Sequence, residues 1–127
     1  MRLTQCILGI VSGVASYLLG GWTVALQVLV VFIIADYVVG VLVAVYLGEL
    51  SSKKGFKGIA RKVLILTLVT VTQLLEGVIF DGGYLLRDAV ILFYTANEAI
   101  SILESVGKTS IPIPQKLKNT IEILKEK

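Results

Sequence analysis

The chain has 127 residues, of which 56% are hydrophobic and 17% are charged, and its net charge is +3. Its mean hydropathy of +0.89 reflects more apolar surface than a globule of this size can bury, so the composition predicts an integral membrane protein. The sequence contains no histidine and one cysteine, which excludes an internal disulfide and a zinc site, and we expect neither a metal nor a cofactor. It also lacks a phosphate-binding glycine loop and the Ser/His/Asp set of a hydrolase, so we expect no enzyme activity.

Four apolar segments have about the length that a membrane-spanning helix requires. They cover residues 3–19, 22–47, 63–80 and 84–106. We therefore predict an all-α integral membrane protein with three or four transmembrane helices in residues 1–107. A basic cytoplasmic tail with a short amphipathic helix is expected to follow at residues 108–127.

The first segment is the least hydrophobic of the four, because polar side chains and glycines interrupt it. Three interpretations stay open: it spans the membrane, it lies in the interface, or it is a signal peptide cleaved after Val14-Ala15-Ser16. Gly9 and Gly13 are four residues apart, a spacing typical of a face on which another helix packs closely.

The second segment carries one carboxylate, Asp36, within an otherwise apolar run. A charge in the middle of a bilayer costs about 2.5–3.5 kcal/mol or more, so this side chain must face protein, water or a proton. Gly40, Ala44 and Gly48 follow at four-residue spacing and form a small-residue ridge that favours close helix contact. Three arrangements stay open for Asp36: it shares a proton or hydrogen bond within one subunit, it joins a ring around a wet lumen, or it bonds another group inside the bundle.

A basic loop is expected at residues 49–62, between the second and third segments. Its positive charges are Lys53, Lys54, Lys57, Arg61 and Lys62. Lysine and arginine accumulate on the cytoplasmic side, which places this loop, and after two further crossings the C-terminus, in the cytoplasm. The Gly-x-x-Gly spacing in the loop resembles a nucleic-acid clamp, but topology and anionic headgroups explain the charges. We therefore expect anionic membrane lipids as partners, and no nucleic acid.

The third and fourth segments form a helical hairpin around the turn Asp81-Gly82-Gly83. Glu76 lies on a polar face near the end of the third segment. Arg87 and Asp88 lie at the start of the fourth, and we expect Arg87 to form an ion pair with a neighbouring acid at the outer face.

Polar side chains form one stripe along the fourth segment when residues are placed at 100° intervals. The stripe includes Tyr94, Asn97, Glu98, Ser101 and Ser105. Asp36 and Glu98 each lie about 21 Å from the expected outer end of their segments, so they occupy one level. Because such side chains gain nothing from lipid, we expect the stripe, Asp36 and Glu76 to face a lumen or an interface between copies in a homo-oligomer.

After the fourth segment, Pro112 and Pro114 cannot continue a helix, although Pro114 can begin a new one. Leu117, Ile121 and Leu124 then recur at helical spacing among lysines and glutamates. This pattern predicts a short amphipathic helix that rests on headgroups or on a neighbouring subunit, or a solvated tail that holds the C-terminus inside.

Four stretches of the chain share their order and character with one family of membrane proteins. They are DYVVG from Asp36, GFKGIARKVLI from Gly55, LLRDAVILFYTANEAISILE from Leu85 and IPIPQKLKNTIEILKEK from Ile111. Through them the chain resembles the bacteriophage holins of the toxin-secretion/phage-lysis type. The resemblance begins at about Leu29, and residues 3–20 contain no matched motif.

The resemblance implies a holin, a multi-pass protein of the bacterial cytoplasmic membrane that assembles with copies of itself into pores or lesions. These lesions release an endolysin or a toxin, which is a passenger and not a stable partner, and trigger host cell lysis. Two alternatives stay open. One is a small ion or proton channel or transporter in which Asp36 and Glu98 relay protons, and the other is an antiholin that delays lysis.

Overall fold

The computed structural model of the chain describes residues 2–126. Its helices are α1 Arg2–Leu19, α2 Val24–Leu47, α3 Ser52–Ile79, α4 Leu85–Gly107 and α5 Gln115–Glu126. The described residues contain no β-strand, and α1 to α4 are each long and apolar enough to cross a membrane. The prediction of an all-α membrane protein with a short C-terminal amphipathic helix is confirmed.

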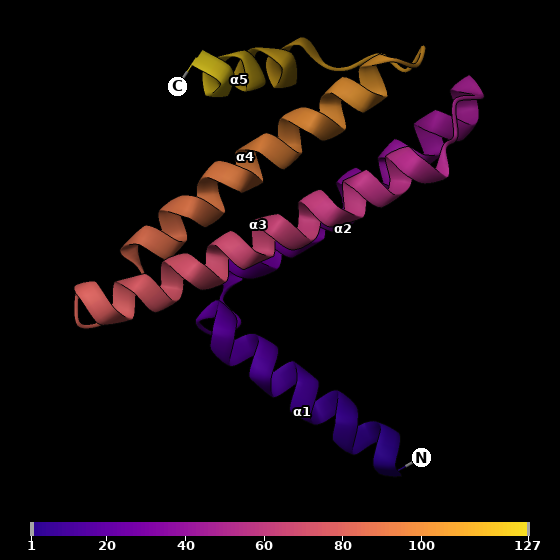
Figure 1. The fold of residues 1–127 in the computed structure, drawn as a ribbon. Helices are drawn as coiled ribbons and strands as arrows, with labels where there is room; N and C mark the ends of the chain where they lie inside the picture. The colour runs from indigo at the N-terminus through magenta and orange to yellow at the C-terminus, as the bar shows by residue number, and fades with distance from the viewer. Residues whose placement is uncertain (1, 127) are drawn as a thin grey trace.

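The packed body of the protein consists of α2, α3 and α4, which lie beside one another in Figure 1. Their buried apolar side chains form one cluster. It contains Leu26, Leu29 and Ile33 from α2, Ile65 and Val69 from α3, and Ile91 from α4. The cluster holds the three helices together and sets which of their faces meet.

A capping residue defines each end of α2, and the connection from α2 to α3 is short. The Thr23 hydroxyl accepts a hydrogen bond from the Leu26 N–H at 3.3 Å and caps the start of α2. Gly48 ends α2 in the left-handed conformation (φ 71°), and its N–H donates to carbonyls of the last turn. Ser51 then caps α3, accepting from the Lys54 N–H at 3.4 Å.

The expected basic loop at residues 49–62 is therefore mostly helix. Because α3 begins at Ser52, the basic residues lie on its first turns, and Lys62 lies well inside the helix. Hydropathy indicates only the part of a helix that crosses lipid. The helix itself begins at its capping residue and can include charged residues that water solvates. For this reason the sequence analysis starts the third helix too late.

In Figure 1, α1 projects away from the body and meets it near the α1 C-terminus. It has no buried residue, and its Leu3 and Tyr17 are 73% and 78% exposed. A Cβ added at Gly9 or Gly13 would meet no described atom within 4 Å. The predicted packing face of α1 is therefore unoccupied by this chain, and its use by another helix stays a prediction.

The two glycines of the small-residue ridge of α2 also make no close contact with another helix of this chain. A Cβ at Gly40 or Gly48 would meet no described atom within 4 Å. Gly40 and Ala44 instead line a cleft, and Gly48 serves as the α2 cap.

The C-terminal helix α5 lies near the end of α4 (Figure 1) and contacts it. Ile121 is buried on α5, whereas Leu117 and Leu124 are about two-fifths exposed. The apolar side of α5 is therefore only partly covered.

Candidate functional site

Three charged side chains meet where α2, α3 and α4 pack together. The Lys62 ammonium donates a hydrogen bond to the Glu98 carboxylate at 2.6 Å and another to the Asp36 carboxylate. The side chain of Glu98 is 2% exposed, and those of Asp36 and Lys62 are 11% and 13% exposed. We call Asp36, Lys62 and Glu98 the ion triad. One ammonium pairs with two carboxylates, so the acids outnumber the cation, and each helix contributes one of the three groups.

The ion triad explains how Asp36 is tolerated in an apolar helix. A buried carboxylate is costly unless it is paired and hydrogen-bonded. By helical rise, Asp36 lies about 18 Å from the start of α2 and Glu98 about 20 Å from the start of α4, so both reach the same cation. Of the arrangements open at the sequence level, the structure has the one in which Asp36 bonds a partner inside the bundle.

Lys62 is the residue of this site that the sequence interpretation missed, because it was assigned to a loop. A signal was present. Lys62 lies three residues before Ile65 and seven before Val69, on the face of α3 that is buried, and a helix brings such positions onto one side. Extending the buried face of α3 by one turn places a lysine opposite the two acids.

The polar stripe of α4 faces the other helices of the same chain. Glu98 is inside the ion triad, and Ser101 and Ser105 line the cleft beside it. Tyr94 is half-buried and packs against the apolar core, and Asn97 is also half-buried. The one charged member of the stripe, Glu98, is thus sheltered within one protomer, so it does not by itself require the neighbouring copies that the sequence analysis expected.

Glu76 has a structural role at the hairpin between α3 and α4. Its side chain is buried, and its carboxylate accepts hydrogen bonds from the N–H groups of Leu86 (2.9 Å) and Arg87 (3.3 Å). The N-cap residue of α4, Tyr84, makes no side-chain capping bond. Glu76 therefore satisfies the free N–H groups of α4 from the neighbouring helix, where the helix dipole favours a negative charge.

Arg87, on α4, forms hydrogen bonds with the segment that connects α1 to α2. Its side chain is buried and donates to the carbonyls of Leu19 (3.2 Å) and Gly20 (2.7 Å) and to the Thr23 hydroxyl (3.3 Å). It also forms an ion pair with Asp88 at 2.9 Å. Three of its five side-chain hydrogen bonds go to Leu19, Gly20 and Thr23 at the link between α1 and α2, so Arg87 positions the start of α2 against α4.

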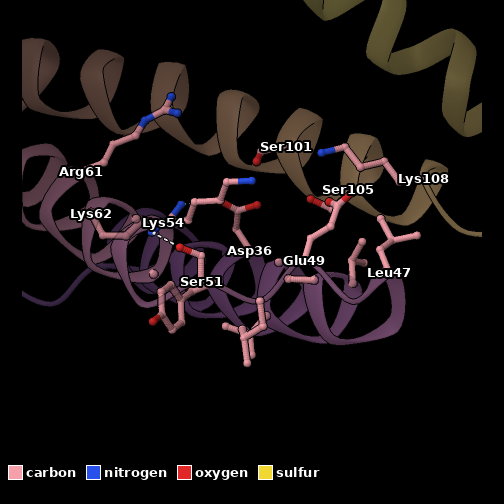
Figure 2. A pocket seen from close by; sticks show the side chains of 18 residues that line it. Asp36, Leu47, Glu49, Ser51, Lys54, Arg61, Lys62, Ser101, Ser105 and Lys108 are labelled. Carbon is pink, nitrogen blue, oxygen red and sulfur yellow. Dashed lines mark hydrogen bonds and ion pairs between the residues drawn. The ribbon is translucent and has the colours of Figure 1, made fainter.

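A cleft of about 300 Å³ opens beside the ion triad, between the second half of α2, the start of α3 and the end of α4. Figure 2 shows the charged side chains of Asp36, Lys54, Lys62 and Lys108 around this opening. No group of three or more potential metal ligands occurs among the described residues. The charged and hydroxyl side chains of the cleft can form ion pairs and hydrogen bonds with a ligand.

Fold and site together define an all-α membrane protein whose packed helices bury an ion triad. The sequence pattern of the bacteriophage holin family matches residues 13–126. The chain belongs to this family, and the resemblance stated in the sequence analysis is confirmed. The match begins within α1, later than its first two turns.

Relatives of the chain come from bacteria and from a phage. An uncharacterized protein of Listeria innocua is 49% identical over 116 residues, which is 91% of this chain and 82% of that protein. An uncharacterized protein of Clostridium acetobutylicum is 35% identical over 121 residues, 95% of this chain and 97% of the relative. A probable holin of Bacillus phage phi105 is 31% identical over 99 residues, 78% and 73% of the two chains. No solved structure matches the chain.

Proposed function

We propose that the protein is a holin that assembles into homo-oligomers in the bacterial cytoplasmic membrane and forms lesions there. The lesions release an endolysin or a toxin and trigger host cell lysis. Membership of the holin family and the similarity to a probable phage holin support this role. The oligomer, the lesion and the passenger are our inference.

The observation that carries the proposal is the unpartnered state of α1. Five of its polar and small residues fall within about 100° of one another around the helix. They are Gln5, Gly9, Ser12, Gly13 and Ser16, and we call them the α1 stripe. Since α1 is long enough to span a membrane and has no buried residue in its own chain, its stripe is available to pack against another copy.

The α4 face supplies a second surface in this proposal. Tyr94, Asn97, Ser101 and Ser105 are half-buried, so they remain available to line an interface or a lumen. Asp36 and Glu98 join that surface when Lys62 no longer holds them inside the protomer, and Glu76 does so when the hairpin opens.

The orientation in this proposal follows from the basic residues. Lys53, Lys54 and Lys57 lie at the start of α3, and the excess of lysine and arginine on cytoplasmic ends of membrane helices puts this end inside. With all four apolar helices crossing, the basic C-terminal tail is inside too.

Cys6 provides a direct test of association through α1, because it is exposed, free and beside the α1 stripe. Mild oxidation of membranes that contain the protein should yield a disulfide-linked dimer, which Cys6→Ser abolishes. Gly9→Leu/Gly13→Leu should reduce the dimer, whereas Ile7→Leu/Val11→Leu, four residues apart on the opposite face, serves as the matched control. Equal dimer yields in both double variants would remove α1 from the interface.

Release of a co-expressed cytosolic endolysin tests the lesion itself. A holin causes a sudden drop in culture turbidity and frees the endolysin, and retention of the endolysin at full expression would contradict the proposal. An antiholin would instead delay lysis by a second holin.

The alternative of a narrow ion or proton channel has one observation in its favour. The cleft reaches Asp36 and Lys62 of the ion triad, so solvent has a route to charges deep in the helices. Ion flux from vesicles without passage of the endolysin would support this alternative over the lesion.

A further inference from the structure

The cleft beside the ion triad carries positive charge that the triad does not use. Its walls contain four cationic side chains, Lys54, Arg61, Lys62 and Lys108, and two carboxylates, Asp36 and Glu49. Lys62 is held by the triad. Within residues 2–126, the structure has no ion pair of Lys54, Arg61 or Lys108 with another described side chain. An anion is the ligand that such a wall favours.

The other wall of the cleft is apolar, and small residues keep it open. Its aliphatic side chains are Val41, Val43, Leu47 and Leu50. Gly40 and Ala44 lie between them on α2 and leave the space that larger side chains would fill. A ligand that fits both walls has a negatively charged end and a hydrocarbon part.

The depth of the cleft matches the headgroup level of a bilayer. By helical rise, Lys62 lies about 26 Å and Lys54 about 38 Å from the end of α3 at Ile79, whereas the hydrocarbon core is about 30 Å thick. The cleft thus extends from the edge of the hydrocarbon into the layer of phosphates. In Figure 2 the ammonium end of Lys108 points toward Ser101 across this opening.

We propose that the cleft binds one anionic phospholipid, with the phosphodiester between Lys54, Arg61 and Lys108 and an acyl chain along the apolar wall of α2. Ser105 and Glu49, which also line the cleft, provide hydrogen-bond partners for headgroup hydroxyls. This chemistry selects phosphatidylglycerol over a zwitterionic lipid. The inference depends on the membrane location of the chain and not on lesion formation.

Native mass spectrometry of the full-length protein in detergent tests the site. The probes are dioleoyl-phosphatidylglycerol, dioleoyl-phosphatidylcholine and inorganic phosphate as a competitor. We expect one phosphatidylglycerol per protomer to be retained in preference to phosphatidylcholine. Equal retention of the two lipids would overturn the proposal, and displacement of phosphatidylglycerol by an equal concentration of inorganic phosphate would assign the cleft to free phosphate instead.

A matched pair of double variants separates a built site from general surface charge. Lys54→Ala/Lys108→Ala removes two cations from the cleft, and Lys53→Ala/Lys57→Ala removes two cations that do not line it. A basic residue near anionic lipid contributes enough for the first variant to weaken phosphatidylglycerol binding on the order of 30-fold. The second variant should change binding by no more than about twofold, because it leaves these contacts intact.

Equal losses of lipid binding in the two double variants would show that the lipid is held by diffuse charge, which overturns the site. Circular dichroism of each variant confirms that its helix content is unchanged. Endolysin release by the wild-type protein and the variants is scored separately, so that equal retention of the two lipids, or equal losses in the two double variants, with normal lysis rejects the lipid site alone. Failure of the wild-type protein to lyse cells rejects the proposed holin activity and leaves the lipid measurement valid.

Discussion

Removal of Lys62 is the most direct test of the ion triad, because this residue supplies the cation between two buried carboxylates. Lys62→Met keeps a long apolar stem and leaves Asp36 and Glu98 side by side without their cation. Breaking a buried ion pair by deleting one partner costs about 3–5 kcal/mol. With the two carboxylates only 11% and 2% exposed, we expect Lys62→Met to lower the free energy of unfolding by about that amount.

The ratio of two carboxylates to one ammonium predicts a different result for the acids. Asp36→Asn or Glu98→Gln leaves one carboxylate paired with Lys62, so each single variant should cost about 1 kcal/mol, the net value of one hydrogen bond. Neutralising all three positions together should recover most of the loss caused by Lys62→Met, because replacing a whole buried ion cluster is often close to neutral.

Titration of the detergent-solubilised protein with sodium dodecyl sulfate, followed by circular dichroism, measures these free energies. Lys57→Met is the control, because Lys57 is an exposed residue of the same helix. The reasoning is refuted if Lys62→Met unfolds at the same detergent fraction as the wild type. It is also refuted if the triply neutral variant is as unstable as Lys62→Met.

Three further substitutions test the contacts at the other end of the body by the same titration. Gly20→Ala should cost about 1–2 kcal/mol, because its Cβ would lie 2.7 Å from the Gln73 side chain at a backbone φ of +86°; full stability would show that Gln73 moves freely. Arg87→Lys should cost about 2 kcal/mol, since an ammonium cannot reach the Gly20 carbonyl and the other acceptors together, and an unchanged unfolding midpoint would contradict this. Glu76→Ala should cost about 1–2 kcal/mol by exposing the start of α4 without its cap, and a loss no larger than that of an exposed surface variant would remove the capping role.

The fold could be predicted from sequence because the bilayer imposes a length on each apolar run. The second segment was expected at residues 22–47 and α2 occupies Val24–Leu47, and the fourth was expected at 84–106 and α4 occupies Leu85–Gly107. The third differs most, since α3 begins at Ser52. Hydropathy responds to lipid contact, and the cap at Ser51 that starts this helix lies outside the lipid-crossing part.

The site was predictable only in part. Equal distances along two helices indicate that Asp36 and Glu98 share a level, and both bind one ammonium in the structure. The cation that binds them, Lys62, is the last of a run of basic residues whose pattern indicates membrane topology. That pattern does not distinguish a buried lysine from the exposed ones beside it. The role of Glu76 depends on how the turn at Asp81-Gly82-Gly83, all in the left-handed region, brings α4 back against α3, and no sequence spacing encodes that contact.

From the distribution of charges we infer that folding of the protomer and assembly of copies depend on different parts of the chain. In α2, α3 and α4 both carboxylates of the ion triad are paired with Lys62 within one protomer, so these buried acids find their partner without a second copy. No residue of α1 is buried, so we propose that association with another copy takes place through the α1 stripe. Because the α1 stripe and the ion triad share no contact, their variants should act additively in the initial dimer, before Lys62 releases Asp36 and Glu98: changes in the triad alter unfolding, and changes in α1 alter dimer yield. Strong coupling between Gly9→Leu/Gly13→Leu and Lys62→Met would mean that assembly and the triad act as one unit.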